Sequence, residues 1–210
     1  MKRITLFILL TIIGIGCSGK PVDESNPQSV YEDALEDINN ERYQLAQEKL
    51  RTVRNKFPYS AAATEAHLKI ADIYFLQEAY VEAAAAYEAF RDLHPKHEKS
   101  GYASFRIGES YYKDIPDTIS RDLTSAYKAQ DSIQAFIEQS NDQAQTTLAK
   151  KYLLETRTAL ASKEFYIAKF YSKQEDHPAV IVRCKKILEL YPETDIANQA
   201  KELLEKSEKK

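Results

Sequence analysis

The chain of 210 residues contains little glycine, little cysteine and no tryptophan. Only five glycines occur, and two of them, Gly14 and Gly16, lie in the first sixteen residues, so the rest of the chain holds three. The usual share of glycine is about 7%. This scarcity argues against turn-rich β-sandwiches and barrels, and against a glycine-rich phosphate loop. With 29% charged and 43% hydrophobic residues, the composition indicates an ordered protein rich in helices.

The sequence also lacks an apolar run long enough to cross a membrane. A spanning helix needs about 20 apolar residues, whereas the longest run, 4–15, has twelve. Lys2 and Arg3 precede this run, and small residues lead from it to Cys17. This order predicts a signal peptide over residues 1–16. It resembles a bacterial lipobox, in which the cysteine is released by cleavage and lipidated. The alternative is a plain secretory peptide in which Cys17 is incidental.

Neither a disulfide nor an excess of basic charge is expected in the mature chain. A lipid on Cys17 would leave Cys184 as the single thiol, so no disulfide could form within one chain. Removal of residues 1–16 takes away two basic and no acidic residues, which leaves a charge of 27 − 32 = −5. An acidic body offers no basic footprint for a phosphate backbone, so we exclude binding of nucleic acid.

Residues 17–28 follow the predicted cleavage point. They contain two prolines and mixed charges without apolar periodicity, which predicts a flexible tether between the lipidated Cys17 and the folded body. In lipoproteins of enterobacterial type, an aspartate beside the lipidated cysteine favours the inner membrane. Ser18 stands there in this chain. The resemblance therefore implies the outer membrane, with the protein lipid-anchored and facing the periplasm.

The folded body, residues 29–210, is built from repeats. Each copy contains a small residue, a second small residue twelve positions later, and a proline twelve positions after that. The copies are Ala34, Ala46 and Pro58; Ala71, Ala83 and Pro95; and Ala168, Val180 and Pro192. Each proline ends a helix. The spacings resemble the tetratricopeptide repeat. They predict an all-α fold, a right-handed α-solenoid of tetratricopeptide-like helix hairpins with about four repeats plus a terminal helix.

The third repeat departs from this spacing. Gly108 and its partner Ala129 are 21 residues apart instead of 12, which predicts an insertion around 113–122, where Pro116 forbids a continuous helix. The next interval, from Ala129 to Ala168, exceeds its counterpart by 14 residues, close to four helical turns. We therefore expect one long helix over 144–173. With a final helix at about 194–208, the total is nine helices.

Candidate catalytic and metal-binding motifs are weak. Ser125 and Lys128 match the S-x-x-K pattern of penicillin-binding enzymes, but the companion motifs are missing. His94 and His97 supply two potential metal ligands without a third nearby in the sequence, which favours a solvated turn. Cys184 occupies the position that apolar side chains fill in other repeats, so we expect an inert core thiol. We predict no enzyme activity, no metal and no cofactor besides the lipid on Cys17.

Short stretches in a fixed order point to a family. They are Tyr43-x-x-Ala46, Lys56-Phe-Pro-Tyr-Ser60, Leu93-His-Pro-x-His97, Arg121-Asp122, Leu160-Ala161-x-x-Glu164, Ala179-Val-x-x-Arg183 and Tyr191-Pro-Glu-Thr194. Together with the lipobox and the insertion in the third repeat, they resemble the BamD family, also called ComL, of the β-barrel assembly machinery.

This resemblance implies a non-enzymatic scaffold on the periplasmic face of the outer membrane. Its C-terminal half would bind a POTRA domain of the barrel-forming assembly protein. Its N-terminal half would receive unfolded outer-membrane proteins, and other assembly lipoproteins can be further partners. The main alternative is another periplasmic repeat lipoprotein, acting in cell-envelope or peptidoglycan maintenance. An envelope hydrolase is disfavoured because no catalytic site is present.

Two sets of binding residues follow from these resemblances. Inner helices of tetratricopeptide repeats line a concave face, which predicts a groove for an extended, aromatic-ended peptide. Its predicted residues are Tyr31, Leu35, Ile38, Leu68, Asp72, Phe75, Tyr102, Phe105, Glu109 and Tyr112. The alternative is that these side chains only pack against neighbouring repeats. Arg183 matches an arginine in the half of the family that meets the POTRA domain, so we predict it at the partner interface. The alternative is that Arg183 is a solvated side chain that pairs locally with Glu189.

Overall fold

The computed structural model describes residues 22–118 and 120–209, and over these residues it contains nine α-helices and no strand. The helices are α1 (Pro27–Asn39), α2 (Tyr43–Lys56), α3 (Ala61–Leu76), α4 (Tyr80–Leu93), α5 (Ser100–Lys113), α6 (Thr124–Gln139), α7 (Gln143–Lys173), α8 (His177–Leu190) and α9 (Asp195–Ser207). The predicted signal peptide and Cys17 lie outside the described residues.

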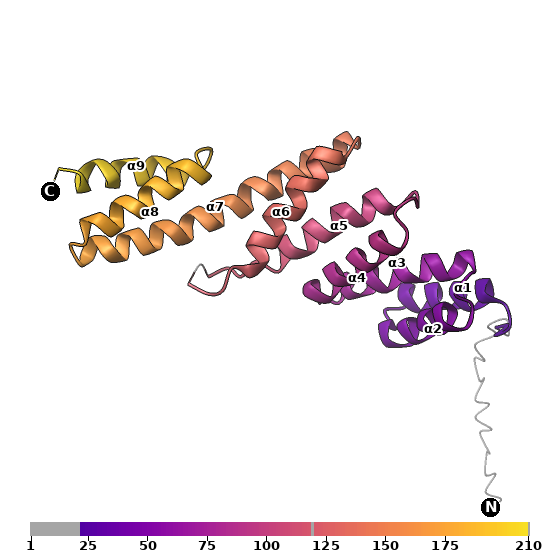
Figure 1. Ribbon diagram of the computed structural model, residues 1–210. Coiled ribbons are helices and arrows are strands. Elements are labelled where there is room, and N and C mark those ends of the chain that lie inside the picture. Colours follow the sequence, from indigo (N-terminus) through magenta and orange to yellow (C-terminus); the bar gives the residue numbers. More distant parts are fainter. Residues whose placement is uncertain (1–21, 119, 210) are drawn as a thin grey trace, which may run out of the picture.

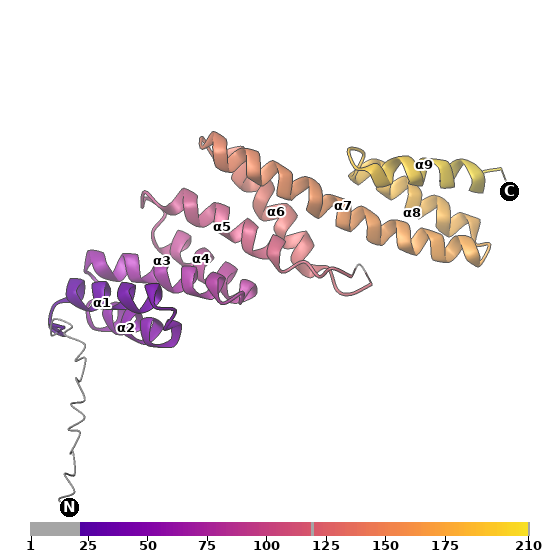
Figure 2. The same ribbon diagram turned by 180° about the vertical axis from the view of Figure 1, so that it is seen from behind.

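Each helix packs on the next one along the chain, and α1 also contacts α3, α5 contacts α7, and α7 contacts α9. Figures 1 and 2 show the resulting elongated stack, with α1 and α9 at opposite ends. This is the all-α solenoid of helix hairpins that the repeat spacing predicts.

The helix boundaries follow from local capping chemistry. The helix α1 begins at Pro27 and so includes the last two residues of the predicted tether. The Asn26 side chain accepts a hydrogen bond from the Gln28 backbone N–H at 2.9 Å, and proline suits the first helical position because it needs no acceptor there. Ser60 caps α3 and Asp142 caps α7 in the same way.

The irregular third repeat has the predicted form. The described residues between α5 and α6, 114–118 and 120–123, include Pro116 and are not helical. The helix α7 is continuous over 31 residues, within one residue of the predicted range 144–173. Its N-terminal part packs in a core with α5 and α6, and its C-terminal part packs in a second core with α8 and α9.

The small residues of the repeat allow close helix contact. Ala34, Ala71 and Ala168 are fully buried. Gly108 stands at the same position in the third repeat, where a Cβ atom would lie 2.6 Å from Ile133 Cγ1 on α6. That separation is too short for any side chain, so the approach of α6 requires glycine at position 108.

Three hairpin turns share an unusual backbone conformation that the sequence did not indicate. Glu41, Glu78 and Glu175 have φ angles of 58°, 58° and 59°. In each turn the following N–H donates to the carbonyl five residues earlier, for example from Ala79 to Tyr74 at 2.9 Å. This is the pattern of a Schellman cap, whose left-handed residue is usually glycine.

We expect glycine in place of Glu78 to stabilise the protein. The Glu78→Gly variant removes the left-handed strain, partly offset by the greater freedom of glycine in the unfolded chain, so the free energy of unfolding should rise by about 0.5–1 kcal/mol. Thermal denaturation should show a gain of about 1–4 °C. The control is Gln77→Gly, because Gln77 has an ordinary φ of −84° and should lose stability. Equal losses in both variants would contradict the prediction.

Candidate functional site

Side chains from α3, α4, α5 and α7 form a cluster that we call the aromatic cluster. Its members are Asp72 and Phe75 of α3, Tyr87 of α4, Tyr102, Phe105, Arg106, Glu109 and Tyr112 of α5, and Tyr152 of α7. Six of these residues were predicted for the groove, whereas Tyr87, Arg106 and Tyr152 were not.

Asp72 is the polar centre of the cluster on the α3 side. The Tyr87 and Tyr102 hydroxyls donate to its Oδ1 at 2.7 and 3.0 Å, and Lys69 Nζ donates to its Oδ2 at 2.8 Å. Burial, followed by the charge of Asp72, raises the pKa of Tyr102 to about 12. Both hydroxyls therefore stay protonated and remain donors, and the Asp72 carboxylate is satisfied from within the protein.

Arg106 joins this centre to the α5 and α7 side. Its Nη1 donates to Glu109 Oε2 at 2.8 Å, and its Nε donates to the Tyr87 hydroxyl at 3.2 Å. The guanidinium carbon lies 3.5 Å from the centroid of the Phe75 ring, a cation–π arrangement. Glu109 also accepts a hydrogen bond from the Tyr152 hydroxyl at 3.2 Å. Arg106 stands three residues before Glu109, the one local signal that the sequence offered for this pair.

Aromatic rings fill the rest of the cluster. The Tyr112 and Tyr152 rings stack with centroids 4.2 Å apart and planes 17° apart, and the Phe105 ring lies 6.5 Å from that of Tyr152. The Tyr112 hydroxyl donates to Glu155. Because Glu109 pairs with Arg106 and Asp72 pairs with Lys69, the surface of the cluster offers ring faces and hydroxyl groups more than net charge. It is suited to apolar and aromatic segments of a polypeptide.

The predicted groove residues divide by exposure. Tyr31, Leu68, Phe105 and Glu109 are buried, at 9% exposure or less. Asp72, Phe75, Tyr102 and Tyr112 are partly exposed within the aromatic cluster. Tyr31, Leu35 and Ile38 belong to the N-terminal core formed with α2 and α3. Side chains on α3 and α5 are therefore the ones that the structure brings together.

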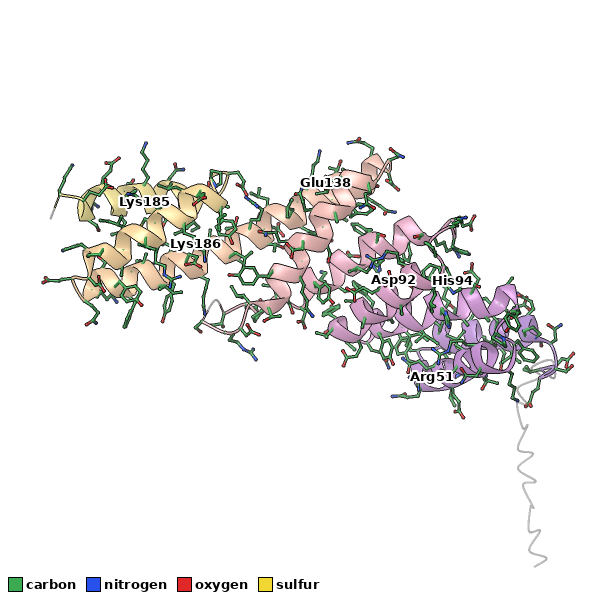
Figure 3. All side chains as sticks on the ribbon, viewed as in Figure 1. Arg51, Asp92, His94, Glu138, Lys185 and Lys186 are labelled. Carbon is green, nitrogen blue, oxygen red and sulfur yellow. The ribbon has the colours of Figure 1, made fainter. Side chains whose placement is uncertain are left out.

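Arg183 lies on α8 and pairs with α7. Its Nη1 donates to Glu164 Oε2 at 2.8 Å, and Lys186 Nζ donates to Glu164 Oε1 at 2.6 Å. The local partner is thus Glu164, not Glu189 as the alternative expected. Burial raises the pKa of Glu164, but the hydrogen bonds from Lys186 and Arg183 outweigh it and hold that pKa below its usual value. Figure 3 shows Lys185 and Lys186 on α8, beside α7.

The other motifs show no catalytic arrangement. Ser125 donates a hydrogen bond to Asp114, while Lys128 Nζ lies 5.1 Å from the centroid of the Tyr111 ring. Cys184 is fully buried, and burial raises the pKa of its thiol to about 11. In residues 22–118 and 120–209, no three histidine, cysteine or acidic side chains are grouped so as to hold a metal ion. None of the described helices has the length and apolar character to span a bilayer.

Two histidines meet between α3 and the end of α4. His67 Nδ1 and His94 Nε2 lie 3.2 Å apart, and Figure 3 marks His94 at the end of α4. Arg54 faces His67, while His97, Glu65 and Lys99 lie around the turn that contains His94. The hydrogen bond requires one of the two facing nitrogens to be unprotonated, so the pair cannot hold two extra protons.

We expect this pair to make stability depend on pH. Burial lowers the pKa of His67, with Arg54 and His94 adding to the effect, and burial and His97 lower that of His94. The native state then binds fewer protons than the unfolded chain, whose histidines have a pKa of about 6.5. Stability should therefore fall as pH decreases below about 6.5, towards the lower native pKa values. Urea denaturation between about pH 7.5 and 5 measures this slope.

His67→Gln should flatten that slope, because one member of the pair no longer titrates. His177→Gln is the control, since His177 lies on α8, in the other half of the chain. A slope that is unchanged in His67→Gln would contradict the prediction.

The fold and the clusters described above define a helical-repeat scaffold: a stack of hairpins with side-chain clusters formed by several helices. Comparison with known sequences identifies which scaffold family this is. The family model YfiO, described as "Outer membrane lipoprotein", matches residues 23–210, and the chain belongs to this family.

Relatives in several bacteria are similar to the chain over nearly all of its length. A protein of Pasteurella multocida is 27% identical, covering 97% of this chain and 83% of the relative. A protein of Neisseria gonorrhoeae is 24% identical, covering 100% of this chain and 85% of the relative. A protein of Vibrio cholerae is also 24% identical, covering 97% of this chain and 89% of the relative. Each is named "Outer membrane protein assembly factor BamD". These names describe an assembly factor and not an enzyme, which agrees with the predicted non-enzymatic scaffold.

Proposed function

We propose that the chain is a lipid-anchored scaffold of the outer membrane, facing the periplasm, that assists the assembly of β-barrel proteins. The observation that carries this proposal is the family match over residues 23–210, together with relatives that are named as assembly factors. The lipobox-like segment before Cys17 supports the anchor.

One surface would bind the substrate, and a second surface would bind the partner protein. The aromatic cluster would receive unfolded outer-membrane proteins, because its ring faces suit apolar segments and its charged side chains are paired within the protein. The α7–α8 hairpin would meet a POTRA domain of the barrel-forming assembly protein. There Glu164 is shared by Arg183 and Lys186, so the group carries a net positive charge. The Arg183 side chain is 34% exposed and has further N–H groups to offer a partner carboxylate.

Purification from detergent-solubilised membranes tests the proposal. A large β-barrel protein with POTRA domains should co-purify with the intact chain. Photoreactive groups at Phe75 and Tyr112 should crosslink to unfolded outer-membrane proteins, whereas a group at Val182, an exposed position on α8, should not. If no barrel protein co-purified, the alternative of a repeat lipoprotein in cell-envelope or peptidoglycan maintenance would replace this proposal.

The lipid anchor has its own test. Cys17→Ala should leave a folded protein that is released from the membrane or retains its signal segment, because the three hydrophobic cores are built from residues between 30 and 204 of the described chain. Several acyl chains anchor a protein stably, and without them only protein contacts would hold it. Membrane fractionation in cells without the barrel protein is the measurement, with Cys184→Ala as the control. Outer-membrane fractionation of Cys17→Ala in such cells would contradict the anchor.

A further inference from the structure

A groove of about 740 Å³ lies where the start of α5 meets the connection between α6 and α7. These two segments lie close together in both Figure 1 and Figure 2. Tyr102 and Phe136 form the aromatic part of the groove wall. Tyr102 also belongs to the aromatic cluster through its bond to Asp72. The groove therefore shares a side chain with the surface to which we assign unfolded substrates.

Gly101 lies in the wall of this groove, and no contact within the protein requires glycine at this position. Gly101 is the second residue of α5, and a Cβ atom added there would meet nothing within 4 Å. Its φ angle is not positive either. Glycine in a helix costs up to about 1 kcal/mol relative to alanine. Gly108 on the same helix is required by Ile133. Neither packing nor backbone geometry requires glycine at position 101. Because Gly101 has no side chain, the α5 backbone there is accessible to a bound molecule.

The rest of the lining favours a ligand that is polar but uncharged. The lining holds two cations, Arg91 and Lys99, and two carboxylates, Glu98 and Asp142, so it carries no net charge. Arg91 binds Asp92 at 3.0 Å, Lys99 binds Glu65 at 2.8 Å, and Asp142 accepts a hydrogen bond from the Gln145 backbone N–H at 2.9 Å. Figure 3 shows Asp92 near the end of α4. The hydroxyl and amide side chains that line the groove include Ser100, Ser132, Gln139 and Gln145. Such groups both donate and accept hydrogen bonds, as the N–H and C=O groups of a peptide backbone do.

We infer that this groove binds an extended, uncharged polypeptide segment through its backbone, as a second substrate subsite beside the aromatic cluster. The inference rests on the proposed function for the identity of the polypeptide. The aromatic cluster would take side chains of the substrate, and the groove at Gly101 would take the adjoining main chain. Bare backbone at Gly101 lets the bound strand approach α5 closely, and Tyr102 links the two subsites.

The test uses the full chain and a labelled synthetic peptide of about ten alternating apolar and polar, uncharged residues. Gly101→Trp fills the groove, and the control is Val182→Trp, at an exposed position on α8 outside the groove. Fluorescence anisotropy should show binding weakened about tenfold or more by Gly101→Trp and changed less than about twofold by Val182→Trp. Both variants should keep the melting temperature, because Val182 is exposed and a Cβ atom at position 101 meets nothing within 4 Å. A peptide with N-methylated backbone amides should bind as weakly as the Gly101→Trp variant does to the original peptide.

Three results would overturn the inference: undiminished binding to a folded Gly101→Trp, equal binding of the N-methylated peptide, or displacement of the peptide by a chitin-type oligosaccharide. Failure here is separable from failure of the proposed function. Crosslinks from Phe75 and co-purification of the barrel protein do not depend on the groove, so they would persist if only the second subsite were wrong.

Discussion

Replacement of Tyr87 by alanine should produce the largest loss of stability of any single change considered for this chain. The Tyr87 side chain is fully buried, and its hydroxyl both donates to Asp72 and accepts from Arg106. Truncation of a buried aromatic residue costs about 3–5 kcal/mol. The melting temperature should fall by roughly 6–20 °C in a chain of this size.

Tyr87→Phe separates the ring from the hydroxyl. It retains the packing and removes one hydrogen bond to the Asp72 carboxylate, for which we expect about 1.5–3 kcal/mol. Tyr59→Ala is the matched control, because Tyr59 is fully exposed and its loss should change the free energy of unfolding by less than about 0.5 kcal/mol. If Tyr87→Phe were as stable as the unaltered protein, the network around Asp72 would contribute nothing measurable.

Simultaneous removal of Arg183 and Lys186 should have the second large effect. In the Arg183→Met and Lys186→Met double variant, the Glu164 side chain stays 7% exposed without either cation. Loss of the partners of a buried charge costs about 3–5 kcal/mol. Each single variant should cost less than half of this, because the other cation remains, so chemical denaturation should show strong non-additivity. Additive single losses would contradict a shared pair.

A third substitution, Glu164→Leu, should restore most of that loss, since an apolar residue no longer needs a cation. The triple variant then separates structure from recognition, because it is folded but lacks both Arg183 and Lys186. Loss of binding to an isolated POTRA region by this variant would support these two cations at the partner interface, and full binding would limit Arg183 to its structural role.

The same variants differ in acid sensitivity. The native pKa of Glu164 is lowered, so its ion pairs add stability above the unfolded value of about 4.3. That contribution is lost as pH falls from there through the native pKa. The triple variant, which has no carboxylate at position 164, should lose less stability over this pH range than the unaltered protein.

The sequence was sufficient to predict the helices, because their signals are local. Proline at fixed spacing, alanine at helix contacts and the excess length before Ala168 gave the order of helices, the connection around Pro116 and the long α7. Glutamate at the left-handed turn positions was not predicted, since glycine is the usual residue there. Those turns depend on bonds such as that from Ala79 to Tyr74, which only the packed hairpin holds in place.

The candidate site was predicted less completely, because its contacts join distant parts of the chain. Spacing within repeats selected Asp72 and Glu109. It could not show that Arg106 and Tyr152 bind Glu109, since Tyr152 is 43 residues further along the chain. Glu164 and Arg183 were both noted as family motifs, yet their pairing across 19 residues emerged only from the way α7 packs on α8.

The continuity of α7 has a mechanical consequence. Tyr152 of the aromatic cluster and Glu164 of the ion-paired group lie on this one uninterrupted helix, twelve residues or about 18 Å apart along its axis. The two ends of α7 pack in separate hydrophobic cores, and the helix between them is unbroken. It therefore connects the two cores rigidly, without a hinge about which they could rotate independently. A partner that tilts the α7–α8 hairpin should therefore also shift the ring of Tyr152, so that docking at one end would alter the cluster that we propose as the substrate site.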